Sequence, residues 1–435
     1  MPEKLSKKNF ILGVLNGAIF RLGLSFTAPH TVLPLFVSLL TSSKVLIGSV
    51  VTIRAFGWFM PQVFIASFTE HWQKRKPIYI LGAVLRGSSF FLLFILIYFW
   101  GKKMSFLFLV SFFILYGTAS LGGGLGGLPF LDIIGKVITP RHRGKFFSLR
   151  LFFGGILAVG GGLLVRYVLA HPIHFPFAYN YALLFFLTFL FTSLGMLLFV
   201  FIREPAELPA LKQRSSFFVY LKRIGIILRD DKNYSRLFWA IIFLNCGIIA
   251  LPFYAVYGRE VLHFPSEMTG VFVAAQMMGA IISALLWGFL SDRYGNKIVV
   301  VLAGLMGLLI PCLVILTILL YKMAIFPELL LTIYTIVFVL VGMNLNGLFI
   351  GQNNLLLEIA PAGERATYIG VANTAIGLVS LLSLLGGYII ERTSYTVLFF
   401  LSLILVLTGI FLAFSIVEPR NKESRPSSCN LKQSS

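Results

Sequence analysis

The chain is dominated by long, uninterrupted apolar segments, each of about the length needed to cross a lipid bilayer. A helix needs roughly 20 apolar residues to span ~30 Å of hydrocarbon. Twelve segments meet this requirement: residues 11–40, 45–68, 77–99, 105–131, 146–170, 178–202, 236–258, 268–290, 298–321, 328–352, 367–390 and 395–417. Because they are continuous rather than alternating apolar with polar residues, they predict spanning helices and not barrel strands.

Composition supports an all-α polytopic membrane protein. Hydrophobic residues make up 58% of the chain and charged residues only 12%, whereas soluble domains are about a quarter charged. The first apolar segment continues to Leu40, which is too long for a cleavable signal, so we expect an uncleaved span. Cys246, Cys312 and Cys429 show neither a disulfide framework nor zinc-site spacing.

The distribution of basic residues predicts the orientation. Of the 36 Lys and Arg residues, 25 fall in the two ends and the loops that share their side, six fall in the opposite loops, and five fall within spans. Positive residues accumulate on the cytoplasmic side of membrane proteins. Both termini are therefore expected in the cytoplasm, with the chain in the cell (inner) membrane. The net charge of +20 is dispersed among apolar segments, which argues against nucleic acid as a partner.

A polar stretch divides the spans six and six. The predicted parts are an N-terminal six-helix bundle (1–202), a cytoplasmic middle loop (203–235), a C-terminal six-helix bundle (236–418) and a disordered cytoplasmic tail (419–435). Within the loop, apolar residues from Phe217 to Leu228 recur at helical spacing beside Lys222 and Arg223. This pattern favours an amphipathic helix at the membrane surface, with a solvated linker helix as the alternative.

The two halves repeat each other at a constant offset of 222 residues. The matched pairs are Glu70 with Asp292, Arg143 with Arg365, Gly155 with Gly377, and Asp132 with Asn354. Each pair occupies the same position relative to the order of the spans. Since an even number of spans separates the copies, the halves have parallel topology, related by an axis along the membrane normal.

One loop of the repeat carries a recognisable motif. GFLSDRYGNK at 288–297 resembles the signature loop of the major facilitator superfamily, between helices 8 and 9. The copy between helices 2 and 3 is degenerate: ASFTEHWQKRK at 66–76 has Ala66 for the first glycine, Glu70 for the aspartate and Gln73 for the second glycine. Together with the twelve spans, the resemblance covers nearly the whole chain. It implies two six-helix bundles that rock about a central cavity.

The signature loops predict a gate. An acidic residue at the cytoplasmic end of a helix can pair with basic residues of its own loop or approach the positive N-terminus of a helix in the other bundle. Contacts made in one state only would bias the equilibrium between the two states. The alternative is that the basic residues simply anchor the loops inside. The candidate gating residues are Glu70, Lys74, Arg75, Gly288, Asp292, Arg293, Gly295 and Lys297.

Three arginines lie about ten residues into spans 1, 2 and 3, close to the membrane midplane: Arg21, Arg54 and Arg86. An arginine there costs at least ~2.5–3.5 kcal/mol, so each needs a partner or a wet cavity. No Asp or Glu lies at this depth. A bound anion would supply the missing charge, because guanidinium binds carboxylate or phosphate bidentately. The alternative is a structural brace, favoured for Arg86, since helix 3 of this fold lies outside the cavity.

Amides from the second half are the other candidate substrate contacts: Asn245, Gln276, Asn344 and Asn373. Such amides also commonly tie helices together, which is the alternative for each of them. Near the inner ends of helices 4 and 5, Asp132 and Arg150 are a candidate ion pair. His30, toward the outer part of helix 1, is either protonatable or a hydrogen-bonded structural histidine.

The sequence thus favours a secondary transporter that moves a small organic solute, anionic or amphipathic, by alternating access. Efflux of hydrophobic drugs or lipids is the alternative, and a membrane-embedded lipid-modifying enzyme is a remote one, because no nucleophile motif or metal spacing occurs. The expected partners are the solute, membrane lipid and a coupling ion, a proton or another. No cofactor and no catalytic residue are expected, and the protein is expected to act as a monomer.

Overall fold

The computed structural model describes residues 3–69, 72–103, 106–205, 225, 227–323, 326–361 and 365–420. Every regular element in these ranges is a helix. The described residues contain ten helical segments that are long and apolar enough to cross a membrane. Most of the middle loop, including the stretch in which an amphipathic helix was predicted, and the tail from residue 421 lie outside the described residues.

The first half makes six passages. Its helices are α1 (Glu3–Ser25), α2 (Val32–Leu40), α3 (Lys44–Thr69), α4 (Lys76–Trp100), α5 (Phe106–Val137), α6 (Pro140–Ala170) and α7 (Tyr179–Val200). We call residues 3–205 the N-bundle. Within it α1 packs on α6 and α7, while α4 packs on α5 and α7. Each passage corresponds to one predicted segment.

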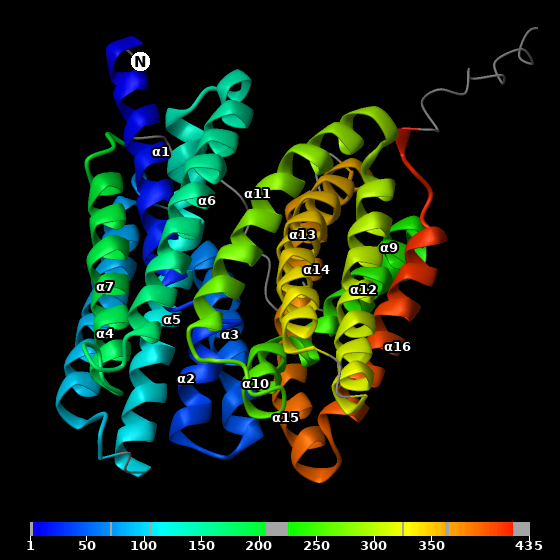
Figure 1. Ribbon diagram of the computed structural model, residues 1–435. Coiled ribbons are helices and arrows are strands. Elements are labelled where there is room, and N and C mark those ends of the chain that lie inside the picture. The colour runs from blue at the N-terminus through cyan, green and yellow to red at the C-terminus, as the bar shows by residue number, and fades with distance from the viewer. Residues whose placement is uncertain are drawn as a thin grey trace, which may run out of the picture.

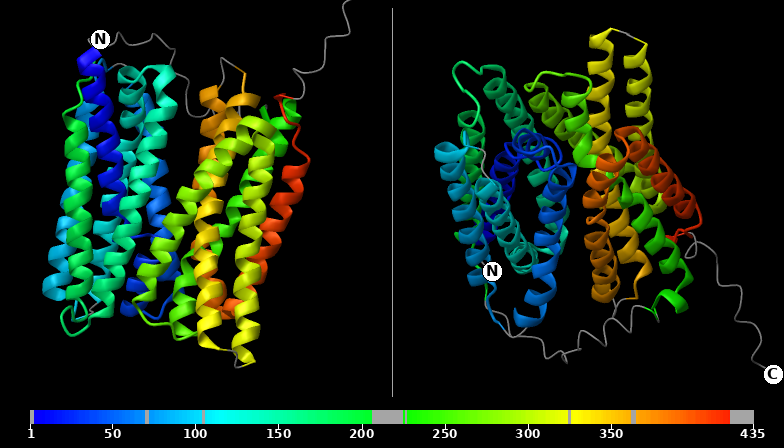
Figure 2. Two further views of the ribbon diagram at one scale, coloured as in Figure 1. Left: turned by 45° about the horizontal axis from the view of Figure 1, so that its top comes forward. Right: turned by 90° about the horizontal axis from the view of Figure 1, so that it is seen from below.

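The second half makes six passages as well. Its helices are α9 (Lys232–Asn245), the short 3-10 helix η1 (Cys246–Ile249), α10 (Leu251–Glu260), α11 (Met268–Tyr294), α12 (Asn296–Lys322), α13 (Pro327–Ile359), α14 (Arg365–Val379), α15 (Leu382–Arg392) and α16 (Tyr395–Phe414). We call residues 227–420 the C-bundle. The chain is therefore an all-α polytopic membrane protein with six passages in each bundle, side by side in Figure 2.

Three passages that were predicted as continuous helices are interrupted. The first passage breaks between α1 and α2, around Pro29, whose ring removes a backbone donor. The seventh breaks at η1, just before Pro252. The eleventh breaks between α14 and α15 without a proline; there the Ser380 hydroxyl bonds to the Gly377 carbonyl at 2.6 Å and competes with the helix. Each break leaves backbone N–H and C=O groups without partners inside the helix, so that they can bond to other groups at the interface between the bundles.

Both described ends of the chain lie on the same side of the molecule, at the top of Figure 1. We call this the terminus side and the opposite one the far side. On the far side a single apolar core joins the two bundles, including Val37 and Val50 with Phe253 and Phe272. On the terminus side each bundle has a core of its own, around Phe146 in one and Tyr234 in the other.

The bundles touch mainly along two helix pairs, α6 with α11 and α3 with α15. Both contacts use the far-side parts of these helices. A side chain at Gly162 would lie 2.7 Å from the backbone nitrogen of Ala274, and one at Gly48 would collide with the carbonyl of Ser383. Glycine thus permits the close approach. Toward the terminus side, the ribbons of α6 and α11 diverge (Figure 1).

Candidate functional site

A cavity of about 180 Å³ lies between the bundles at mid-depth. The break at η1 in the seventh passage, between α9 and α10, helps to form the cavity, since Gly247, Ile248 and Leu251 all line its wall. Most of the wall is apolar. The polar side chains that line it are His30, Arg54, Asn245, Tyr254, Asn344 and Ser402. Among the residues that the structure describes, no Asp or Glu lines the cavity. The cavity therefore offers positive charge and neutral polar groups on an apolar surface.

Arg54 supplies the charge. It lies ten residues into α3, about 15 Å from the far-side end at ~1.5 Å per residue. Its side chain is exposed to the space between the bundles. Among the described residues, none forms a hydrogen bond or ion pair with it; the Tyr116 hydroxyl, His30 and Arg86 lie close enough to interact with it electrostatically. The guanidinium thus keeps its donors available to a bound molecule.

The C-bundle contributes two amides to the opposite wall. The Asn245 Nδ2 donates to the Ile241 carbonyl at 2.8 Å and to Gln352 Oε1 at 3.3 Å. The Asn344 Nδ2 donates to the Ala303 carbonyl at 2.8 Å. Both amides therefore tie helices together, as the alternative interpretation held, while lining the cavity at the same time. Their carbonyl oxygens are the groups left to accept from a solute.

The other predicted substrate contacts lie away from this cavity. Arg21 is half-buried between α1 and α6, where a side chain at Gly154 would lie 2.8 Å from its Cδ. Gln276 is buried on α11, and its Oε1 lacks a hydrogen-bond partner in the described residues. Asn373 is half-buried on α14. The structure thus brings together Arg54, Asn245 and Asn344 from the predicted set, but not these three.

Two further arginines are enclosed in the N-bundle. Arg86 donates to the Ala119 carbonyl at 3.2 Å and lies over the rings of Phe20 and Phe90, at 5.4 and 5.3 Å. The contacts with Ala119 and Phe20 join α4 to α5 and α1, as in a structural brace. The Arg150 guanidinium lies 4.1 Å from the ring centroid of Phe130.

The predicted pairing of Arg150 with Asp132 is wrong. Asp132 instead pairs with Lys136, one turn further along α5, at 2.9 Å, and with Arg75 at 3.4 Å. An i,i+4 partner on the same helix is within reach at little cost in side-chain entropy. Arg150, on another helix, packs against an aromatic ring.

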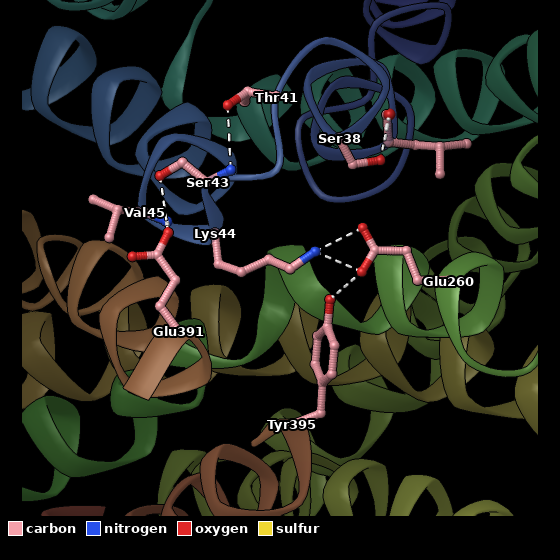
Figure 3. A network of polar contacts seen from close by, with 9 residues as sticks. Ser38, Thr41, Ser43, Lys44, Val45, Glu260, Glu391 and Tyr395 are labelled. Atoms are coloured by element: carbon pink, nitrogen blue, oxygen red, sulfur yellow. Dashed lines mark hydrogen bonds and ion pairs between the residues drawn. The ribbon is translucent and has the colours of Figure 1, made fainter. Parts of the chain in front are cut away.

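A polar clasp closes the far side of the molecule (Figure 3). The ammonium of Lys44, at the start of α3, bonds to both carboxylate oxygens of Glu260, at the end of α10, at 2.7 and 2.5 Å. The Tyr395 hydroxyl donates to the same carboxylate at 2.7 Å. Nearby, Ser43 donates to Glu391 at 2.9 Å. Lys44 and Ser43 belong to the N-bundle and their partners to the C-bundle, so the clasp ties the two bundles together.

A second set of bonds between the bundles lies deeper in the molecule, at the break between α14 and α15. The Thr52 hydroxyl on α3 contacts the Ser380 carbonyl at 2.8 Å and the Ser383 hydroxyl at 2.7 Å. Ser383 in turn bonds to the Gly48 carbonyl at 3.0 Å. The break between α14 and α15 thus exposes a carbonyl that α3 uses. These bonds and the clasp lie on the far-side part of α3, beyond Arg54.

A sequence model of the Major Facilitator Superfamily matches residues 15–383 and, in a second match, 249–430. The chain belongs to the Major Facilitator Superfamily. The two overlapping matches cover both halves of the chain, in keeping with the repeat. No curated protein sequence matches the chain significantly.

Solved structures of transporters from this chain's fold class superpose along nearly its full length. A point mutant of the nucleoside transporter NupG matches with a TM-score of 0.69 at 13% identity, over 95% of this chain and 99% of its own. A POT family transporter in complex with a thioalcohol-conjugated peptide gives 0.69 at 14% identity, over 95% and 96%. A bacterial homologue of the iron transporter ferroportin, inward-facing, gives 0.65 at 14%, over 95% and 99%. At these identities the likeness shows the fold alone.

The superfamily's signature loop in the C-bundle connects α11 to α12. Gly295 has φ of +90°, and a side chain there would lie 2.6 Å from the Glu418 carboxylate, so glycine is required. Lys297 donates its backbone N–H to Glu418 at 2.8 Å and its ammonium to the Phe414 carbonyl at 2.8 Å. The Arg293 guanidinium lies over Phe289 and Tyr294. All these contacts stay within the C-bundle.

Of the two acidic gating candidates, the structure describes Asp292, and this residue has no hydrogen bond or ion pair with a described residue of the N-bundle. Asp292 is exposed at the terminus-side end of α11 and has no hydrogen bond or ion pair with a described residue. At Gly288, an added Cβ would have no described atom within 4 Å. Glu70 lies outside the described residues.

The N-bundle copy of the loop is held by an acid that the sequence interpretation missed. Glu204, after α7, accepts from the backbone N–H groups of Arg75 and Lys76, at 2.9 and 3.0 Å, and from the Lys136 ammonium at 3.0 Å. Lys74 is exposed beside this cluster. Glu204 thereby caps the start of α4.

Glu418 holds the start of α12 in the same way, because it accepts from the Lys297 N–H. Burial raises the pKa of the Glu418 carboxyl, against the opposing hydrogen bond from Lys297. Arg420, which was assigned to the tail, bonds to Glu358 at 2.7 Å. The signal was available in the sequence as two Glu-Pro pairs, 204–205 and 418–419, each directly after a bundle's last helix. Their spacing differs from the offset of 222, so a constant-offset comparison does not align them.

Proposed function

We propose that this superfamily member carries a small organic anion with an apolar body across the membrane, and that Arg54 binds the negative group. The observation that supports this most strongly is an exposed guanidinium at mid-depth, in a cavity between the bundles. Among the described residues, the guanidinium has no protein partner and the cavity wall has no carboxylate. Membership of the superfamily supports solute transport as the general activity.

The positive charge of Arg54 favours an anion over other solutes. Placing an arginine at the bilayer centre costs at least ~2.5–3.5 kcal/mol. An arginine at that depth is therefore expected to have a function, such as binding a charged group. A carboxylate or phosphate would satisfy the guanidinium with two parallel hydrogen bonds. A lipophilic cation would meet uncompensated positive charge instead. We therefore disfavour efflux of lipophilic cations, although the apolar wall suits other amphipathic molecules.

The size of the cavity favours a small solute. Pockets for drug-sized ligands have volumes of ~300–1,000 Å³, whereas this cavity measures about 180 Å³. On the wall contributed by the C-bundle, Asn245 and Asn344 offer carbonyl oxygens to a hydroxyl or amide donor on the solute. Arg21 remains a candidate contact, for a solute on its way between the terminus side and Arg54.

Transport by alternating access fits the arrangement of contacts. We propose that the structure represents a state closed on the far side by the clasp of Lys44 with Glu260, and that rocking of the bundles breaks the clasp and closes the terminus side. The asymmetry of basic residues supports the terminus side as cytoplasmic, which makes this state inward-facing.

Three ligands of similar shape but different charge test the anion site. Benzoate, benzamide and benzamidine share a ring and a planar head group but carry charges of −1, 0 and +1. Benzoate is expected to raise the melting temperature of the purified protein, and the other two are not. A ligand at a hundredfold excess over its Kd stabilises by about 2.7 kcal/mol. In Arg54→Gln the benzoate effect should disappear.

Arg86→Gln is the matched control, because Arg86 is the same residue type enclosed between α4 and α5. It should lower the melting temperature without ligand and keep the benzoate response. Stabilisation by benzamidine rather than benzoate would contradict the anion proposal, and so would equal responses to all three. A benzoate response that survives in Arg54→Gln would place the site elsewhere.

A further inference from the structure

We propose that His30 is the proton-carrying residue of this transporter: it binds one proton together with each anion held at Arg54 and releases it with that anion. The inference rests on the proposed anion site and adds its coupling ion. Anion and proton would move in the same direction, and the pair of a monovalent anion and a proton carries no net charge.

The geometry places His30 in the wall of the anion cavity. It lies in the break between α1 and α2, next to Pro29, so its backbone is not fixed in a continuous helix. Its side chain lines the same cavity as Arg54. The Nδ1 atom is buried and has no hydrogen-bond partner among the described residues. A purely structural histidine would have a partner for a buried ring nitrogen.

The ionisable groups around the cavity single out His30 as the candidate proton carrier. From α3, Arg54 faces it closely enough to act on it electrostatically, and Tyr116 on α5 stands beside Arg54. From α10, Tyr254 lines the same cavity. Neither tyrosine loses its proton in the neutral range. Among the described residues no Asp or Glu lines the cavity, so His30 is the lining group whose ordinary pKa lies closest to neutral.

Coupling follows from the repulsion between the two basic groups. Without a ligand, a proton on His30 would place a second positive charge beside Arg54, at low dielectric. A bound carboxylate or sulfonate removes this obstacle, because its negative charge attracts both. The anion therefore favours protonation of His30, and protonated His30 favours the anion by the same free energy. The proton comes from water on the side where the anion enters and returns to water on the side where it leaves.

Proton uptake on binding is the direct test. Isothermal titration calorimetry of the purified protein with benzoate, repeated in buffers of different ionisation enthalpy, reports the number of protons taken up per anion bound. The titrations are done at pH 7.5, about one unit above the ordinary histidine pKa. We expect an uptake approaching one proton in the wild type and none in His30→Gln. Above neutral pH, the benzoate Kd of the wild type should rise by up to about tenfold per pH unit, while that of His30→Gln stays flat.

Two controls separate the alternatives. Benzenesulfonate cannot hold a proton at these pH values, so uptake with this ligand must occur on the protein. His171→Gln changes an exposed far-side histidine whose Nδ1 lies 2.8 Å from the Tyr167 carbonyl, outside the cavity, and should behave as the wild type. His30→Asn serves as a second variant if His30→Gln fails to fold.

The possible failures are distinguishable. If benzoate binds through Arg54 but takes up no proton in the wild type, or takes up the same number in both His30 variants, the coupling proposal is wrong and the anion site stands. If neither benzoate nor benzenesulfonate binds to the wild type, the anion site itself is refuted, and the coupling with it.

Discussion

Removal of the Lys44 ammonium is expected to open the far side. Lys44→Met keeps the length and apolar character of the side chain but deletes the bonds to Glu260. Among the described residues, the Glu260 carboxylate then keeps the Tyr395 hydroxyl as its one hydrogen-bond partner, and its side chain is 30% exposed. Because the pair joins the two bundles, its loss weakens the state closed on the far side without touching the interior of either bundle.

The magnitude follows from the burial of the pair. At 2.7 Å and an effective dielectric constant of about 20, the direct attraction is about 6 kcal/mol, and desolvation offsets most of it. Exposed pairs contribute ~0.2–1 kcal/mol, and breaking buried ones costs ~3–5 kcal/mol. Side-chain exposures of 17% and 30% place this pair between those limits, at about 2 kcal/mol. The equilibrium should therefore shift by about thirtyfold toward the far-side-open state.

Double electron–electron resonance can measure this shift. Spin labels at Lys103→Cys in the N-bundle and Lys322→Cys in the C-bundle report the distance across the far side; both sites are exposed. The native cysteines are replaced first; these are Cys246, Cys312 and Cys429. We expect Lys44→Met to populate a longer distance that is rare in the parent protein.

The control is Lys102→Met, another far-side lysine, which lies over the Tyr179 ring of its own bundle at 4.6 Å. This variant should leave the distance distribution unchanged. If Lys44→Met does the same, the clasp contributes nothing to closure, and the reasoning from its burial fails.

Two further predictions concern the terminus side. Asp292→Asn should slow transport and retain normal melting, because this exposed side chain has no hydrogen bond or ion pair with a described residue and is proposed to act when the terminus side closes. Unchanged crosslinking rates between the terminus-side ends of the bundles, with unchanged transport, would reduce it to an ordinary loop residue. Reporters fused after residue 435 and inserted at Lys212 should read cytoplasm, and one within 171–176 should read the outside. A middle loop found outside would overturn the assignment from basic residues.

Much of the fold could be predicted from the sequence because a bilayer imposes one simple requirement on every span. Each of the twelve apolar segments corresponds to one passage of the structure. The breaks between α1 and α2, at η1, and between α14 and α15 could not be predicted. A proline within a spanning helix is often tolerated when neighbouring groups satisfy the backbone groups that it frees. Pro61, Pro129 and Pro311 lie inside continuous helices, whereas the break at Ser380 has no proline at all.

The candidate site was partly predictable. Arg54 stood out because charge at mid-membrane is expensive, and it does line the cavity. Arg21 stood out for the same reason but packs between α1 and α6, since depth along a helix does not say which way a side chain points. The clasp joins Lys44 to Glu260 over 216 positions of sequence, and only the packing of the two bundles brings them together.

The most direct test of an anion carrier with Arg54 at its centre is counterflow in liposomes. Vesicles containing the purified protein are loaded with unlabelled benzenesulfonate, which does not cross bilayers unaided, and diluted into a trace of the labelled compound. We predict transient accumulation of label with the wild type and with Arg86→Gln, and none with Arg54→Gln. Equal accumulation with Arg54→Gln, or saturable exchange of benzamidine in place of benzenesulfonate, would contradict the account.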